Sequence, residues 1–145
     1  MRLVTLSAVL VALLATAALA QAVVAPFNMT RLYRTEADFT RAIQPYQQAV
    51  QANARNARAQ YWLGYAYVFT YRQHLAGAAP YASAYLTRSI QPLQEAIKLE
   101  PTMIQAYLAL HDAYALMGEY GKADALVEEM RQRTRPGWLP PIKLN

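Results

Sequence analysis

Few side chains of this 145-residue sequence could carry catalysis or bind a metal. The chain has no cysteine and two histidines, His74 and His111. Thiol chemistry, disulfides and cysteine-bound zinc are therefore excluded, and a histidine metal site is poorly supplied. Glu128 and Glu129 are adjacent, so their carboxylates point in different directions on a helix and are expected to face solvent. The sequence has no glycine-rich phosphate loop and no G-x-S-x-G motif. We predict a protein that is not an enzyme, with no cofactor and no metal site.

Aromatic and basic side chains offer binding chemistry instead. The chain has 11 tyrosines, and its 14 basic residues outnumber 9 acidic ones, for a net charge of +5. Tyr61, Tyr65 and Phe69 recur every four residues, which places them on one face of a helix. Exposed aromatic rings and arginines are typical of the residues that dominate peptide binding. Because the arginines are spread along the chain and form no continuous basic strip, nucleic acid is not expected as a partner.

The first 20 residues have the pattern of an export signal. Met-Arg precedes an uncharged apolar run over residues 3–20, which ends in Ala-Leu-Ala, a small-x-small sequence that signal peptidase accepts. We expect cleavage before Gln21, and a bacterial protein located in the periplasm, in the cell envelope or outside the cell. An uncleaved membrane anchor is the alternative, because a run of this length can just span a bilayer. Lipid attachment of the lipoprotein type would need a cysteine and is excluded.

The residues after this signal are enough for one domain, and that domain is expected to be all-α. Apolar residues recur at helical spacing from Phe27 onward. Charged residues make up 16% of the chain, below the ~25% of an average soluble domain, which argues against disorder.

Two series of matched residues indicate an internal period. The first series, from one helix of each copy, has intervals of 34 and then 47 residues: Tyr33, Tyr67 and Tyr114. The second series, from the helix that follows, has intervals of 47 and then 34 residues: Ala42, Ser89 and Ala123. The same intervals in opposite order predict a 34-residue repeat whose second copy carries 13 extra residues between Tyr67 and Ser89.

In these residues the sequence resembles the tetratricopeptide repeat family, whose pattern is W-x2-L-G-x2-Y, then A-x3-F, then P. The best matches are AQYWLGYAY (59–67), EAIKLEP (95–101) and residues 104–135. The resemblance covers residues 27–136 and implies an α-solenoid over 21–137. It would consist of about three helix-turn-helix repeats, near 23–56, 57–103 and 104–137, with an extended tail over 138–145. The first copy departs most from the pattern, so its first helix is expected to be short or frayed.

The extra residues of the second copy are expected to lengthen its helical hairpin. Only 76–80 looks like a turn, so long helices over 57–75 and 81–99 are predicted, each with about two extra turns, projecting roughly 10 Å. His74 would lie exposed near the tip of this hairpin. His111 stands at the position of Gly64 and would pack between helices. A loose loop over 68–88 is the alternative.

Several residues predict where helices begin and end. Asn56 is a candidate N-cap for the helix that carries Tyr61. Thr102 and Gln105 have the spacing of a capping box. Pro101 should end the preceding helix, and Gly118 suits a left-handed turn between helices.

The family resemblance implies a concave groove lined by one face of each first helix. We predict that this groove binds a peptide or helix of another protein. Its centre would be the aromatic stripe, formed by Tyr61, Tyr65 and Phe69, beside three arginines. The alternative is that some of these rings belong to the core or are covered by the N-terminal segment. The predicted lining residues are Phe27, Arg31, Arg34, Arg58, Tyr61, Tyr65, Phe69, Gln105, Leu108 and Asp112.

The two-carboxylate clamp, with which part of this family grips acidic C-terminal peptides, is not present. That clamp uses lysines and asparagines, whereas the matching positions here hold Phe27, Arg31, Trp62, Gln105 and Ala109. Recognition of a chaperone tail is therefore not expected, although Arg31 alone can still pair with an acidic partner.

The end of the sequence, RTRPGWLPPIKLN over 133–145, has three prolines and one tryptophan. A terminal repeat needs its apolar face covered. Trp138, Leu139 and Ile142 are therefore expected to lie across the last helix as an extended lid. A linear docking motif for another protein is the alternative.

The sequence thus predicts an exported, non-catalytic interaction module that acts as an adaptor or assembly scaffold in the bacterial envelope. Its partner would be another protein or a peptide segment. The alternative is a structural protein that forms a homo-oligomer through the protruding aromatic hairpin. Contact with a membrane is expected only through an uncleaved signal segment.

Overall fold

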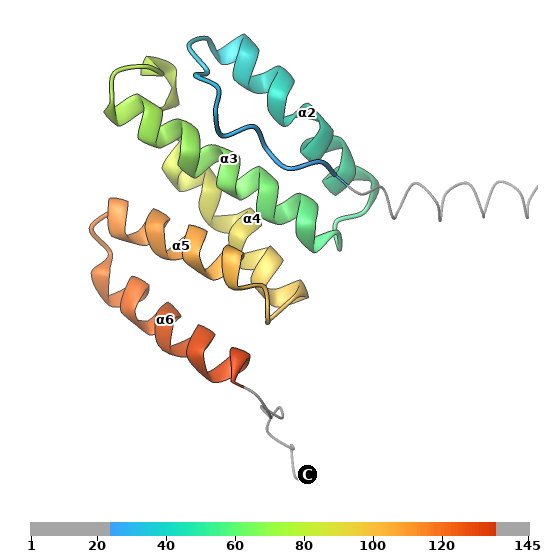
Figure 1. Ribbon diagram of the computed structural model, residues 1–145, viewed down its shortest axis with the longest axis vertical. Coiled ribbons are helices and arrows are strands. Elements are labelled where there is room, and N and C mark those ends of the chain that lie inside the picture. The colour runs from blue at the N-terminus through green and yellow to red at the C-terminus, as the bar shows by residue number, and fades with distance from the viewer. Residues whose placement is uncertain (1–23, 136–145) are drawn as a thin grey trace, which may run out of the picture.

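The computed structural model describes residues 24–135, which are all-helical and contain no strand (Figure 1), so the predicted fold class is confirmed at this level. The predicted signal over 1–20 and the predicted lid residues Trp138, Leu139 and Ile142 lie outside this range. Within 24–135, no helix is long and apolar enough to cross a membrane. The helical elements are α2 (Glu36–Ala52), α3 (Ala57–Leu75), the 3-10 turn η1 (Pro80–Ala82), α4 (Tyr85–Leu99), α5 (Ile104–Leu116) and α6 (Tyr120–Thr134).

Helix α3 lies at the centre of the packing. Successive helices are joined by short turns and pack side by side, and α3 also packs against α5 (Figure 1). The most extensive interface is that between α3 and α4. It is close because Gly64 has no side chain, so Leu93 of α4 can occupy that space. Gly64 is therefore the position at which α3 and α4 approach closely.

Most of the predicted helix boundaries are present. The side chain of Asn56 accepts a hydrogen bond from the backbone N–H of Ala59 and caps α3. Helix α4 ends at Leu99, just before Pro101, and Gly118 has a left-handed φ of 76°. The capping box at Thr102 is wrong: α5 has Met103 at its N-cap and no side-chain cap. Met103 is buried, with its N–H bonded to the Glu100 carbonyl, so the helix starts after it.

The hairpin of the second copy is only partly as predicted. Helix α3 spans the predicted 57–75, but α4 begins at Tyr85 and not near 81, and both α4 and α6 have 15 residues. The extra residues therefore lengthen α3 and form the turn after it. This turn is compact, with Gly77 at a φ of 77° and the side chains of Ala79 and Ala82 buried, so the loose-loop alternative is also wrong.

The two histidines take ordinary structural positions. His74 is half-buried, because its Nδ1 atom lies 3.1 Å from the Ala79 carbonyl oxygen inside the turn, so the prediction that it is exposed is wrong. His111 is half-buried on α5.

Among the described residues, no helix is present where the first helix of the first predicted repeat was expected. Residues 24–34, here called the N-terminal segment, are non-helical and lie over α2 and α3 (Figure 1). Proline at position 26 cannot donate a backbone hydrogen bond, and side chains from later helices bind the segment's backbone in place of helical hydrogen bonds. The prediction of a short or frayed first helix is therefore wrong, because residues 24–34 form no helix.

The core divides into two clusters on either side of α3. One lies between the N-terminal segment, α2, α3 and the turn before α4, and it is rich in aromatic rings, including Phe27, Tyr33 and Phe39. The other joins α3 to α4, α5 and α6 through mainly aliphatic side chains such as Leu93 and Leu110.

Candidate functional site

The structure places the predicted groove residues in different environments. Phe27 is buried, with 2% of its surface exposed. Tyr61, Tyr65, Phe69 and Asp112 are half-buried. The remaining five are exposed: Arg31, Arg34, Arg58, Gln105 and Leu108.

The N-terminal segment covers one end of the aromatic stripe. The ring of Phe27 lies against three other rings, with centroid distances of 5.1 Å to Tyr33, 6.3 Å to Tyr46 and 5.8 Å to Phe69. Phe27 is therefore a core residue, and its prediction as a groove-lining residue is wrong. The alternative, in which the segment covers part of the stripe, is correct for Phe69.

Gln73, buried at the end of α3, holds the backbone of the segment. Its side-chain oxygen accepts a hydrogen bond from the Tyr33 N–H at 2.9 Å, and its side-chain nitrogen donates to the Arg31 carbonyl at 2.8 Å. One amide group thus satisfies a backbone donor and a backbone acceptor, as a neighbouring β-strand would.

Three tyrosines complete the binding of the segment. The hydroxyl of Tyr46 donates to the Ala25 carbonyl at 3.0 Å, and that of Tyr33 donates to the Asn28 carbonyl at 2.9 Å. The hydroxyl of Tyr81 donates to the Tyr33 carbonyl at 2.7 Å. The segment is therefore bound through its backbone and through the buried rings of Phe27 and Tyr33, with a turn at residues 29–30 between them.

The stripe remains open at the start of α3. Here a cavity of about 420 Å³, which we call the groove pocket, lies between the N-terminal segment, α3 and the α4–α5 turn. The Tyr61 ring lies 4.7 Å from the Trp62 ring and 5.8 Å from the Tyr65 ring, measured between centroids. The pocket is lined by Pro26, Arg58, Tyr61, Trp62, Glu100, Met103 and Gln105.

The groove pocket has two charges available for a ligand. Within residues 24–135, neither Arg58 nor Glu100 forms an ion pair. Burial raises the pKa of Tyr61, so its hydroxyl stays protonated and can donate a hydrogen bond. The pocket can therefore hold an apolar side chain between rings and a thioether, while Arg58 and Gln105 bind backbone or acidic oxygens.

Sequence reasoning found three residues of this pocket and missed the others. Arg58, Tyr61 and Gln105 were predicted and are brought together. Trp62 belongs to the repeat motif and to the clamp positions but is not among the predicted groove residues. Pro26 could not be placed without knowing the path of the N-terminal segment. Met103 and Glu100 lie in the turn before α5, which was treated only as a helix boundary.

Four other predicted residues lie outside the pocket. Arg31 pairs with Asp38 at 3.3 Å, so its charge is already partnered. Asp112 pairs with Arg72 at 2.8 Å and links α5 to α3. Arg34 and Leu108 are exposed and do not line the groove pocket.

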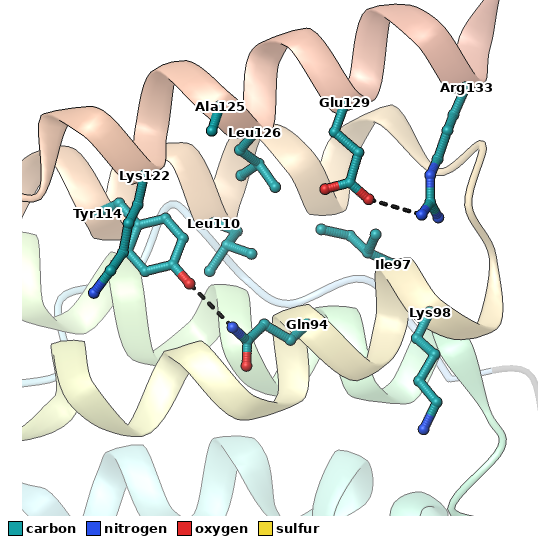
Figure 2. Close-up of a pocket in the computed structure, with 10 residues that line it drawn as sticks. All are labelled: Gln94, Ile97, Lys98, Leu110, Tyr114, Lys122, Ala125, Leu126, Glu129 and Arg133. Atoms are coloured by element: carbon teal, nitrogen blue, oxygen red, sulfur yellow. Dashed lines mark hydrogen bonds and ion pairs between the residues drawn. The ribbon is translucent and has the colours of Figure 1, made fainter.

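A second cavity, of about 500 Å³, lies between α4, α5 and α6 (Figure 2). Its floor is aliphatic, from Ile97, Leu110 and Leu126. The side-chain amide of Gln94 donates to the Tyr114 hydroxyl at 3.0 Å, and Lys122 lies 5.7 Å from the centre of the same ring.

A third cavity, of about 360 Å³, lies between α2, α3 and α4. Several of its lining residues stand at positions equivalent to those that line the second cavity. Its Leu63 and Tyr67 stand 47 residues before Leu110 and Tyr114, and its Arg88 stands 34 residues before Lys122. The side chain of Gln47 hydrogen-bonds Tyr67, as that of Gln94 bonds Tyr114, and Gln47 stands 47 residues before Gln94. Cavities of this kind thus recur where consecutive helix pairs meet, whereas the groove pocket depends on the N-terminal segment.

No group of three or more metal-ligating side chains occurs among the described residues. No family model, curated protein or solved structure matches the chain.

Proposed function

We propose that this chain is a non-catalytic protein-interaction module, exported to the bacterial envelope, that binds an extended segment of a partner protein in the groove pocket. The observation that carries the proposal is the groove pocket itself, where the rings of Tyr61 and Trp62 and the unpaired charge of Arg58 face one cavity. Aromatic rings and arginine are the side chains that most often dominate such interfaces.

The N-terminal segment supports an extended peptide as the ligand. It already lies on the same face of α3, with Phe27 against Phe69 and its backbone bound by Gln73. The stripe continues from Phe69 through Tyr65 to Tyr61, and Tyr61 lines the groove pocket. A partner segment can therefore bind beside Pro26 in an extended form.

We further propose that the helices are three tetratricopeptide-like repeats, the first of which has the N-terminal segment in place of its first helix. The packing of α3 against both α4 and α5 supports this arrangement, as do the two equivalent cavities. So does a repeated sequence on the second helices, since Ile-Gln-Pro occurs at 43–45 and again at 90–92.

A photo-crosslinking amino acid in place of Gln105, in the full chain expressed in its own bacterium, tests the binding proposal. We expect a crosslinked partner whose yield falls about tenfold when Tyr61→Ala and Arg58→Ala are added. Tyr120→Ala is the matched control, because Tyr120 is 66% exposed on α6 and does not line the pocket. An equal yield in all three proteins, with circular dichroism showing that each is folded, would contradict the proposal.

Self-association is a second candidate, favoured by exposed apolar side chains near the end of α3. Met29, Leu32 and Leu75 are each about half exposed, at 48%, 52% and 59%. The hairpin tyrosines are unsuited to this role, because Tyr81 and Tyr85 hydrogen-bond inward. If this surface joins two copies, sedimentation will show a dimer that Leu32→Glu with Leu75→Glu dissociates, and a monomer at high concentration would rule it out.

A further inference from the structure

We propose that the groove pocket is occupied by residues 136–145 of the same chain, so that a partner must displace this proline-rich segment. The inference rests on the proposed function, because it names the class of peptide that the groove takes. That class is an extended segment with prolines and a bulky aromatic residue. The sequence of 136–145 is PGWLPPIKLN.

The described chain ends close to the groove pocket. Helix α6 runs back along α5 and ends at Thr134, beside the start of α5 (Figure 1). Arg133, one residue earlier, hydrogen-bonds the hydroxyl of Tyr107 in the first turn of α5. Gln105 and Met103, at this same end of α5, line the pocket.

Ten residues are enough to reach the pocket. A proline-rich segment rises about 3.1 Å per residue, so it can span about 30 Å. The path from the end of α6 crosses the start of α5, and a helix with its side chains is about 10–12 Å wide. Residues near Leu139 can therefore lie beside Gln105, with the prolines that follow facing Tyr61.

The chemistry of the two surfaces is complementary. Proline-rich segments bind aromatic-lined grooves, because proline fixes φ and little entropy is lost on binding. Tyr61 and Trp62 supply such rings in the groove pocket. Its carboxylate, Glu100, has no ion pair within 24–135, and Lys143 is the one charged side chain of residues 136–145.

The cavity between α4, α5 and α6 also lies near the end of α6 but is less suited to this segment. Its lining is mainly aliphatic and basic, with a single aromatic ring, that of Tyr114. That ring already has Gln94 on its hydroxyl and Lys122 near its face. It therefore offers a proline or tryptophan less aromatic surface than Tyr61 and Trp62 offer in the groove pocket.

The absence of native cysteines allows a direct test in the full chain by disulfide formation. The pair Gln105→Cys with Leu139→Cys reports on the groove pocket. The matched pair Ala125→Cys with Leu139→Cys reports on the other cavity, which Ala125 lines. Under mild oxidation we expect the first pair to close within one chain about tenfold faster, because docking raises the effective concentration of the two thiols.

Any other order of rates overturns the inference. Faster closure of the Ala125→Cys pair would place the segment across the last helix, and equal slow rates would show no docking. Disulfide-linked dimers would show that the segment comes from a second copy. As a further check, Tyr61→Ala should remove the preference for the Gln105→Cys pair, whereas Tyr120→Ala should leave it unchanged.

Partner crosslinking distinguishes this inference from the proposed function. Trp138→Ala with Pro140→Ala should abolish the preferred disulfide and raise the yield of partner crosslinked at position 105. Partner crosslinking without the preferred disulfide would contradict only this inference. A different result would contradict the proposed function: the preferred disulfide forms in the chain without these substitutions, but no partner is crosslinked at position 105 with or without them.

Discussion

At the scale of single residues, Gln73 links the N-terminal segment to the helices. Its amide group makes two hydrogen bonds to the segment's backbone, at Tyr33 and Arg31. Buried backbone groups that lose such partners are costly, because no water replaces them. Two of the hydrogen bonds that hold the segment therefore come from one side chain, 40 residues after Tyr33.

We expect Gln73→Ala to lower the free energy of unfolding by about 2–3 kcal/mol, since two hydrogen bonds are lost and one buried N–H is left unpaired. Urea unfolding measures the loss, and hydrogen exchange at Tyr33 shows whether the segment has detached. Gln48→Ala, at an exposed position of α2, should change neither quantity. An unchanged exchange rate at Tyr33 in Gln73→Ala would show that other contacts hold the segment.

Tyr81 makes the stability of the same region sensitive to alkaline pH. Burial raises the pKa of Tyr81 from 10.0 to about 12, and the charges of Glu36 and Asp38 add to the rise. Burial and Glu36 also raise the pKa of Tyr85. Because the folded-state pKa lies above the unfolded value, this stabilisation is fully present below pH 10 and is lost as the pH rises through about 12.

The stability of the protein should therefore fall between about pH 10 and pH 12, as followed by urea unfolding and tyrosinate absorbance. Tyr81→Phe should cost about 1 kcal/mol near neutral pH, because the bond to the Tyr33 carbonyl is lost, and should make the alkaline loss shallower. The exposed Tyr120 gives the control Tyr120→Phe, which should follow the wild-type curve. A wild-type slope in Tyr81→Phe would assign the pH effect to other groups.

At the scale of elements, the crossing of α3 and α4 depends on Gly64. A Cβ atom at this position would lie 2.5 Å from Leu93 Cγ and 3.1 Å from the Ser89 carbonyl oxygen. Leu93 is completely buried, so its Cγ atom can move only by displacing other core side chains. The distance between the two helices is thus set by the one residue that has no side chain.

We expect Gly64→Ala to lower the free energy of unfolding by about 1–3 kcal/mol, because an overpacked core costs more than the helix propensity that alanine adds. Gly121→Ala in α6 is the matched control, since its Cβ would meet no atom within 4 Å. That change should be neutral or stabilise by up to about 1 kcal/mol. Equal effects of the two substitutions would show that α3 and α4 can separate without cost.

The elements that the sequence predicted well are those with local signals. Helix α3 was predicted to the residue, because Asn56 caps its start and Gly77 follows its end. The capping box at Thr102 failed because burial of Met103 decides where α5 begins. Tyr61, Arg58 and Gln105, which the sequence places on one face, do line one cavity, since helical spacing alone aligns the first two.

The N-terminal segment could not be predicted from its own residues. Its backbone partners, Gln73 and Tyr81, are far away in sequence, and no local pattern reveals a side chain that replaces helical hydrogen bonds. Phe27 was therefore assigned to the groove-lining face of a helix, whereas residues 24–34 are non-helical and Phe27 is buried. The available signals were Pro26, Met29 and Thr30, which depart from the repeat pattern, and proline at position 26 also weakens a helix that begins there.

At the scale of the whole molecule, the two core clusters meet only through α3 and its immediate neighbours. The aromatic cluster holds the N-terminal segment and α2, whereas the aliphatic cluster holds α5 and α6. Damage to one cluster should therefore affect one end of the molecule first.

Phe39→Ala, at a residue 1% exposed, should cost about 3–5 kcal/mol and Leu110→Ala about 2–5 kcal/mol. We expect hydrogen exchange in Phe39→Ala to speed up first in residues 24–52, while the amides of α5 stay protected. Leu110→Ala should give the reverse pattern. Uniform loss of protection in both variants would show a single cooperative unit.

The path of the N-terminal segment has a consequence for the order in which the chain can fold as it is made. The backbone of Tyr33 is hydrogen-bonded by Gln73, which is synthesised 40 residues later, and by Tyr81, which is synthesised 48 residues later. During synthesis, residues 24–34 thus emerge well before the side chains that bind them. A chain exported with its N-terminus leading would cross the membrane with this segment still unpaired, and the segment would bind α3 only after the following hairpin had also crossed.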